Sequence, residues 1–376
     1  MDSAIESYNL GRLGVIGMKG CEEMTYKINE HLRKFNEEKE NHIDSFVIPI
    51  NCPRFGTGEA KAMILHSIRT YDIYIVMDAF NYNVTYNMYG KEHPMSPDDH
   101  YQDLKRIIAA MGGKAKRITV IMPMLYEGRQ HKRVARESLD CAMALQELVN
   151  MGVDNIITFD AHDPRVQNAV PLSGFENVHA TYQMIKACLR YDEHIMLDKE
   201  NTMIISPDEG AVGRCMYYSS VLGMDLGMFY KRRDYSTIVD GKNPIVAHEF
   251  LGNDLTGKDV IVVDDMIASG DSMVDVAREL KKRKARRVLV FSTFGLFTEG
   301  AEKFNKAYAD GLIDAVFTTN LVYRSPELLA APWYHEVDMS KYIALLIQTL
   351  NEEKSISELL TPISRIEKIL NKYRNK

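Results

Sequence analysis

The sequence predicts an α/β fold of two tandem domains, each a parallel sheet flanked by helices. Short apolar runs rich in β-branched residues, such as 117–121 and 259–263, alternate with amphipathic stretches such as 136–152. Strands that alternate with helices in this way are typical of βαβ units, which place the strands parallel. The length of 376 residues exceeds what one core of ordinary size holds, so two domains are the default expectation.

A series of apolar segments, each bounded by turn or polar residues, is predicted to form strands buried on both faces. In chain order they cover residues 45–50, 71–77, 117–123, 155–160, 202–208, 259–265, 286–292 and 314–319. Within this series 71–76 resembles 258–263, 116–121 resembles 286–291, and 154–159 resembles 314–319. Because these pairs occur in the same order, we expect a duplicated domain.

The domain boundaries follow from this repeat. We predict an N-terminal domain over residues 1–177, a C-terminal domain over 178–345 and a helical C-terminal tail over 346–376. Residues 80–100 are rich in Tyr, Asn and turn-forming residues and are predicted to form a long loop.

Composition excludes several classes of protein. A formal net charge of −6 disfavours a broadly basic nucleic-acid binder, so any phosphate site must come from a local cluster. The five cysteines show no CxxC spacing, which favours reduced cytosolic thiols over a zinc site. The N-terminus lacks the apolar core of a signal peptide, and no run is long enough to span a membrane. We expect a cytoplasmic protein without membrane or nucleic-acid partners.

A doubled aspartate is the most informative local feature. Asp264 and Asp265 end a buried strand, at the edge where α/β sheets bind ligands. Two adjacent carboxylates can hold neighbouring hydroxyls of a sugar but would repel a phosphate. The phosphate would bind to the small-residue loop that follows and to the positive end of the next helix. The loop consists of Ala268, Ser269, Gly270, Asp271 and Ser272. The alternative is a plain strand–turn–helix junction with Asp as the helix cap.

This stretch resembles the phosphoribosyl diphosphate loop of the type I phosphoribosyltransferase fold. Further segments are similar to those of one branch of that superfamily, the ribose-phosphate diphosphokinases, also called phosphoribosyl pyrophosphate synthetases. They are RFGTGE at 54–59, PMLYEGRQ at 123–130, DAH at 160–162 with Gln167, SPD at 206–208 with KRR at 231–233, and SISELL at 355–360. The resemblance thus extends from about residue 13 to residue 360.

The residues of these segments also have chemical interpretations of their own. Phe55 could stack on a purine, or it could be a buried Phe beside a surface Glu. The basic run that Arg129 opens could close over a triphosphate, since Arg makes bidentate contacts, or it could be a solvated face. His162 and Asp208 follow predicted strands, where they could bind a ligand or serve as plain turn residues. Lys231 and Arg233 lie on one side of an extended chain, in a basic run that is costly to bury without anions.

The resemblance implies a specific activity and a set of site residues. It implies transfer of the diphosphoryl group of MgATP to C1 of ribose 5-phosphate, giving phosphoribosyl diphosphate and AMP, by a homo-oligomer (dimer or hexamer). The implied catalytic residues are Lys231, Arg233 and Arg129, and the implied magnesium ligands are His162 and Asp208. The resemblance also implies that residues 126–136 form a flexible catalytic loop. ATP would contact Phe55, Thr57, Gly58, Glu59, Arg129, Gln130 and His162. Ribose 5-phosphate would contact Arg233, Asp264, Asp265, Ala268, Ser269, Gly270, Asp271 and Ser272.

Two alternatives stay open at this point. The chain could be a phosphoribosyltransferase that consumes the activated sugar, although such an enzyme would not need segments 54–59 and 129–130. It could also be a non-catalytic homologue that regulates a true synthetase, although Lys231 and Arg233 are both present. Thr57 and His131 stand where the family has other residues. These departures leave the nucleotide preference and the regulation by ADP and phosphate open.

Overall fold

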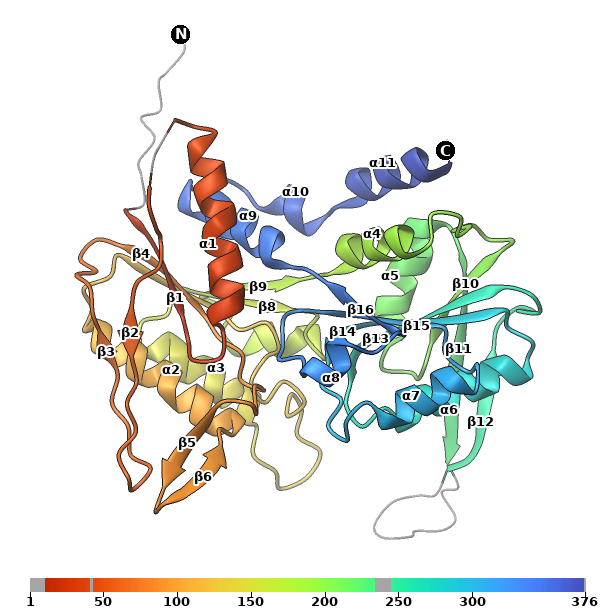
Figure 1. The fold of residues 1–376 in the computed structure, drawn as a ribbon, viewed down its shortest axis with the longest axis horizontal. Coiled ribbons are helices and arrows are strands. Elements are labelled where there is room, and N and C mark those ends of the chain that lie inside the picture. The colour runs from red at the N-terminus through yellow and green to blue at the C-terminus, as the bar shows by residue number, and fades with distance from the viewer. Residues whose placement is uncertain (1–10, 41–42, 234–244, 375–376) are drawn as a thin grey trace. The chain divides into compact units, whose positions relative to one another are not determined.

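The computed structural model describes residues 11–40, 43–233 and 245–374, apart from the side chains of 231–248 and 374 (Figure 1). Its contacts divide the chain into two compact units. The first contains the described residues up to His179, together with 320–323 and 338–361. The second contains 180–319, 324–337 and the described residues from Pro362 onward. The chain therefore returns to the first unit late in the sequence, whereas the predicted boundaries cut it into consecutive pieces.

The first unit is built on a parallel sheet with the strand order β1-β4-β7-β8-β9. These strands are β1 (Leu13–Gly17), β4 (Asp72–Val76), β7 (Arg117–Ile121), β8 (Asn155–Phe159) and β9 (Gly174–Val178). The helices of this unit are α1 (Glu22–Glu37), α2 (Pro97–Met111), α3 (Asp140–Asn150), η1 (Pro164–Ala169), α9 (Ser340–Asn351) and α10 (Ser357–Leu360). Helix α9 packs on α1, while α2 and α3 lie on the other side of the strands (Figure 1). Both faces of the sheet are thus covered, which is why its strands are almost continuously apolar.

Two small antiparallel pairs complete the first unit. They are β2 (Ile50–Asn51) with β3 (Met63–Ile64), and β5 (Thr85–Met88) with β6 (Lys91–Pro94). The second pair corrects the prediction of a long loop over 80–100. This segment forms a hairpin and then begins α2 with a capping box, in which Ser96 and Asp99 satisfy each other's backbone N–H groups.

The second unit contains a wider sheet with the order β12-β11-β10-β13-β14-β15-β16. Its strands are β10 (Thr202–Ser206), β11 (Asp225–Arg233), β12 (Ile245–Leu251), β13 (Asp259–Ile267), β14 (Arg287–Gly295), β15 (Ala315–Thr319) and β16 (Tyr334–Val337). All neighbours are parallel except β12, an antiparallel edge that pairs with β11 and was not predicted. The helices are α4 (Thr181–Tyr191), α5 (Val212–Leu222), α6 (Asp271–Lys282), α7 (Glu302–Ala309), α8 (Pro326–Leu329) and α11 (Ile363–Arg374).

The same ion pair stands at the base of both sheets. In the first unit Arg117 donates from Nε and Nη2 to the buried Asp72, its register partner on the next strand. In the second unit Arg287 donates in the same way to the buried Asp259, again its register partner. The matched register supports the duplication that the sequence repeat predicts.

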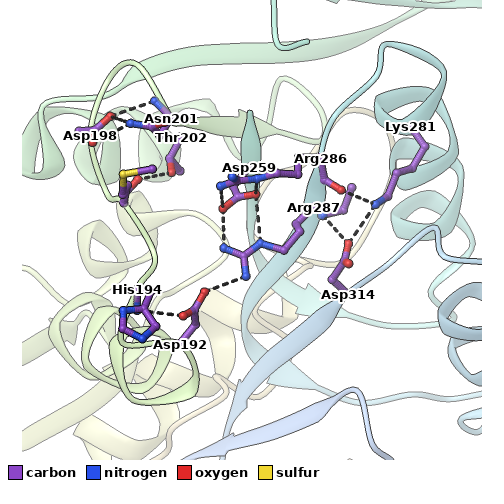
Figure 2. A network of polar contacts seen from close by, with 12 residues as sticks. Asp192, His194, Asp198, Asn201, Thr202, Asp259, Lys281, Arg286, Arg287 and Asp314 are labelled. Atoms are coloured by element: carbon purple, nitrogen blue, oxygen red, sulfur yellow. Dashed lines mark hydrogen bonds and ion pairs between the residues drawn. The ribbon is translucent and has the colours of Figure 1, made fainter. Parts of the chain in front are cut away.

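A second repeated contact lies one strand further along. The carboxylate of Asp154 accepts the backbone N–H of Ile118 (2.7 Å), and that of Asp314 accepts the backbone N–H of Val288 (2.8 Å). In Figure 2 Asp314 accepts a hydrogen bond from Lys281, and Asp259 accepts hydrogen bonds from Arg286 and Arg287. The basic run 281–287 therefore stabilises the base of the second sheet. Among the described residues, no helix is both long and apolar enough to cross a bilayer.

Candidate active site

Asp264 and Asp265 lie on β13, beyond the point where the pairing with the neighbouring strand β10 has ended. The pairing of β10 with β13 stops at Val262, whereas the pairing of β14 with β13 continues to Ile267. Beyond Val262 the strand β13 is therefore open on its β10 side. Asp264 and Asp265 occupy this open stretch, at the carboxyl edge of the parallel strands, as the sequence predicted. This is the edge at which open α/β sheets bind ligands.

The two carboxylates are held in different ways. Asp265 is buried and accepts the backbone N–H of Met266, and the partly exposed Asp264 accepts the N–H of Asp265 (2.8 Å). Burial, and then the neighbouring Asp265 charge, raise the pKa of Asp264 well above its usual value. The Arg214 guanidinium on α5 lies 3.8 Å from Asp264 and favours its ionised form. Two acids at one sheet edge thus store repulsion that a ligand diol or a cation could relieve.

The small-residue loop after β13 leads directly into α6. Gly270 caps α6 with a φ of +86°, a left-handed conformation that favours glycine. A Cβ there would lie 2.4 Å from the ring of the buried Phe304, so packing also requires glycine. Gly270 has no side chain that could cap the first-turn amides of α6, and uncapped amides at a helix start are groups that can bind an anion. Ala268 fixes the other end of the loop by accepting the N–H of Thr298.

The loop also carries charged contacts of its own. Ser269 donates its hydroxyl to Asp271 (3.0 Å), and the Lys303 ammonium lies 2.5 Å from the same carboxylate. Ser272 follows in the first turn of α6.

Asp208 lies beyond the end of the neighbouring strand, β10. Its Oδ1 accepts the backbone N–H groups of Gly210 and Ala211, and this turn leads into α5. Asp208 and the paired acids thus lie at adjacent strand ends of one sheet. Lys231 and Arg233 belong to β11 by their backbone, on the far side of β10, but their side chains lie outside the described residues.

In the first unit the predicted adenine residues form a tight turn. Arg54 and Ala60 form a bridge, Phe55 accepts the N–H of Gly58, and Thr57 donates to the Glu59 carboxylate (2.8 Å). Phe55 is 52% exposed, so the alternative of a buried Phe is wrong. An exposed aromatic ring beside a carboxylate is available to stack on a base.

Arg54 anchors this turn to the first unit. Its guanidinium lies 3.0 Å from Asp103 and 3.7 Å from Asp99 on α2, and over the ring of Tyr86 on β5. Tyr126, at the start of the predicted catalytic loop, donates to Asp98 in the same first turn of α2 (2.7 Å). Both segments are therefore tied to the start of α2, a connection that the sequence did not suggest.

The predicted catalytic loop, 126–136, exposes Arg129 and Gln130 and leaves the side chain of His131 only 11% exposed. The Nε2 of His131 lies 3.4 Å from Asp163, and its ring centroid lies 5.3 Å from that of His162. Asp163 also accepts hydrogen bonds from the Arg165 guanidinium. These hydrogen bonds outweigh the effect of burial and lower the pKa of the Asp163 carboxyl. His131 thus holds the loop against the corner that carries His162.

A cavity of about 730 Å³ lies beside this turn in the first unit. It is lined by the end of β1, by α1, by residues 45–54 and by two residues of β5. Arg54 reaches it, but Phe55, Thr57 and Glu59 are not among the described residues that line it. The turn therefore presents Phe55 outside this cavity.

Comparison with known proteins assigns the chain to a family. A profile described as the N-terminal domain of ribose phosphate pyrophosphokinase matches residues 13–152, and one described as a phosphoribosyl transferase domain matches 174–313. The chain belongs to the ribose-phosphate pyrophosphokinase family. Ribose-phosphate pyrophosphokinases of Pasteurella multocida and Vibrio cholerae are each 28% identical over 312 residues. These alignments cover 82% and 81% of this chain and 90% and 89% of the relatives.

A solved structure shows the same fold. The phosphoribosylpyrophosphate synthetase of Mycobacterium smegmatis superposes with a TM-score of 0.72 at 19% identity, covering 91% of this chain and 99% of that one. The predicted pair of tandem α/β domains is therefore confirmed as the architecture of this ribose-phosphate pyrophosphokinase family member.

The donor set suits a magnesium ion that arrives with a nucleotide. Among the described residues, no three His, Cys, Asp or Glu side chains converge as a metal centre. Magnesium commonly takes only one or two carboxylates and completes its shell with phosphate oxygens and water. Asp208 fits such a single contact. His162 fits less well, because Mg²⁺ prefers oxygen ligands.

The sequence did not predict that Arg214 and Lys303 lie beside the proposed sugar-phosphate residues of the second unit, or that Asp163 contacts His131 in the first unit. Arg214 is the one charged residue in the helix sequence VGRCMYYSSVL, which is a weak indication of a contact with an acidic partner. The other two meet their partners only through folding, since Lys303 is 32 residues from Asp271.

The His131 contact predicts a change in loop mobility. Replacing His131 with Ala removes the contact with Asp163, so trypsin should cleave after Lys132, Arg133 or Arg136 several-fold faster. Limited proteolysis followed by mass spectrometry measures this rate. His66→Ala is the control, because His66 is exposed on another segment. Equal cleavage of both variants would mean that His131 does not hold the loop.

Proposed function

We propose that the chain is a ribose-phosphate diphosphokinase, which transfers the β,γ-diphosphoryl group of ATP to the C1 hydroxyl of ribose 5-phosphate. The observation that supports this most directly is the paired acids beside a glycine-capped helix start, in a chain of this family. The C1 oxygen attacks the β-phosphorus, and the bond from that phosphorus to the α,β-bridging oxygen breaks. The hydroxyl proton passes to solvent, and AMP leaves with the bridging oxygen.

The second unit supplies the groups for the sugar phosphate. Asp264 and Asp265 would accept hydrogen bonds from the ribose hydroxyls, and the 268–272 loop with the start of α6 would bind the 5-phosphate. The stored repulsion between the two acids falls when hydroxyl groups donate to them. Binding in this form sets C1 toward the reacting phosphorus, and such positioning can contribute about 7–11 kcal/mol to the barrier reduction.

The first unit supplies the groups for the nucleotide. Phe55 would stack on adenine, with Thr57, Gly58 and Glu59 at the edge of the base. Arg129, Gln130 and His162 would contact the phosphates. Closure of the 126–136 loop would exclude water, which competes with ribose as the nucleophile. Because this loop is tied to α2 through Tyr126, closure would hinge after that residue.

Charge compensation is the main catalytic task, because both substrates are polyanions. Lys231, Arg233 and Arg129 would stabilise the charge that shifts to the leaving oxygen. Magnesium, contacted by Asp208 and by His162 directly or through water, would supply further charge neutralisation when it is bound. We also propose that the enzyme is cytoplasmic and works as a homo-oligomer.

A two-substrate assay tests the function. The purified chain with ATP, ribose 5-phosphate and Mg²⁺ should release AMP and phosphoribosyl diphosphate in equal amounts, followed by chromatography and phosphorus NMR. Leaving out ribose 5-phosphate should stop AMP release. A phosphoribosyltransferase or a non-catalytic homologue would give no AMP in the complete mixture.

The same assay tests Lys231. Lys231→Ala should release AMP more than tenfold more slowly, because a cation aimed at developing charge contributes about 3 kcal/mol. Lys341→Ala, on α9, is the charge-matched control and should keep the wild-type rate. A Lys231→Ala enzyme within tenfold of wild type would remove this residue from the mechanism.

A further inference from the structure

The loop predicted to bind a phosphate contains a carboxylate, that of Asp271. It accepts the Ser269 hydroxyl (3.0 Å), which is one of the donors proposed for the 5-phosphate. Hydrogen bonds from Lys303 and Ser269 lower the pKa of Asp271, so it is ionised at neutral pH. A carboxylate next to a phosphate monoester is repulsive. The loop therefore contains an internal competitor for its own ligand.

Lys303 is the cation that meets this competitor. Its Nζ lies 2.5 Å from Asp271 and 2.6 Å from Glu299. The helix that carries it, α7, is fixed beside the loop because the buried Phe304 packs directly against Gly270. The packed core therefore fixes the helix backbone from which the Lys303 ammonium extends. Its position draws the Asp271 carboxylate toward α7.

We propose that Lys303 is a positioning residue of the sugar-phosphate subsite, which holds and neutralises Asp271 so that the loop amides and Ser269 can bind the 5-phosphate. This inference rests on the proposed function. It also assigns a specificity role, because only a phosphorylated sugar brings the charge that Asp271 would repel. Unphosphorylated ribose would not depend on Lys303.

A purely structural role makes a different prediction. Lys303 is 33% exposed and Asp271 is 62% exposed. Ion pairs at this exposure contribute little to stability. A structural pair would leave substrate kinetics unchanged when it is broken, whereas a positioning pair would change the KM for ribose 5-phosphate.

Steady-state AMP release by four variants tests the proposal. Lys303→Ala should raise the KM for ribose 5-phosphate about fivefold, with kcat and the KM for ATP within twofold of wild type. Asp271→Asn should lower that KM, because the carboxylate that repels the phosphate is gone. In the Asp271→Asn background, adding Lys303→Ala should cause no further rise in that KM, because the charge that Lys303 offsets is no longer there. Lys303→Arg should keep the wild-type KM.

Lys306→Ala is the matched control, because it removes the same charge from an exposed position on the same helix. Calorimetric titration of ribose 5-phosphate into each variant should follow the order of the KM values. The proposal is overturned if Lys303→Ala behaves like Lys306→Ala, or if the double variant keeps the full rise in KM.

The titration separates the two hypotheses. Wild-type protein that binds ribose 5-phosphate but releases no AMP would contradict the proposed function alone. Wild-type protein that does not bind ribose 5-phosphate would overturn both.

Discussion

Replacing Asp259 with Ala should lower the free energy of unfolding of the second unit by about 3 kcal/mol. Asp259 is buried and accepts hydrogen bonds from Arg286 (2.8 and 2.7 Å) and Arg287 (3.1 and 2.6 Å). Without the carboxylate both guanidinium groups lose this partner, whereas Arg287 keeps a second one in Asp192 (Figure 2). The loss should be smaller than for a fully buried cation, since Arg286 reaches solvent.

Urea denaturation followed by circular dichroism measures this change. The control is Asp275→Ala, which breaks an exposed ion pair with Arg278 on α6 and should change stability by less than about 0.5 kcal/mol. Burial alone would raise the pKa of Asp259, but hydrogen bonds from both arginines outweigh it and lower that pKa. The stabilisation is therefore present above the unfolded pKa and is lost as the pH falls through the folded pKa. If Asp259→Ala were no less stable than Asp275→Ala, the buried network would not stabilise this sheet.

Replacing Asp264 with Asn should stabilise the free protein and abolish most of its activity. Asp264 is costly to ionise, because burial and the adjacent Asp265 both raise its pKa. Removing that charge should raise the free energy of unfolding by about 1 kcal/mol at pH 7. Losing a charged acceptor for the ribose hydroxyls should lower kcat/KM for ribose 5-phosphate about 100-fold. Opposite changes in stability and activity are the mark of a strained functional site.

The pH dependence separates this explanation from a general packing effect. An acid whose folded pKa is raised binds more protons in the folded state, so wild-type stability falls as the pH rises above about 4. The advantage of Asp264→Asn should therefore be greatest at neutral pH and shrink toward pH 4. Thermal unfolding at several pH values measures it, with the exposed Asp310→Asn as control. A constant advantage across pH, or wild-type activity in the variant, would contradict the assignment of Asp264.

The sequence by itself determined the features that depend on near neighbours in the chain. Alternating apolar runs predicted the strands, and the repeat of 71–76 in 258–263 predicted the duplication, because buried strands and their first charged residue are local patterns. Asp264, Asp265 and the small-residue loop were predicted as a sugar-phosphate site for the same reason. These features are contiguous in the chain: a strand, two acids and a glycine turn. Their chemistry can therefore be predicted without knowledge of the fold.

Only the tertiary structure decided the contacts between distant segments. In the second unit Lys303 meets Asp271 and Arg214 approaches Asp264, and in the first unit His131 meets Asp163, because within each unit folding brings distant segments together. The return of α9 to pack on α1 and the antiparallel edge β12 likewise depend on long-range pairing. Periodicity encodes which face of a segment is buried but not which distant segment buries it. The charges that tune this site were therefore visible only after folding.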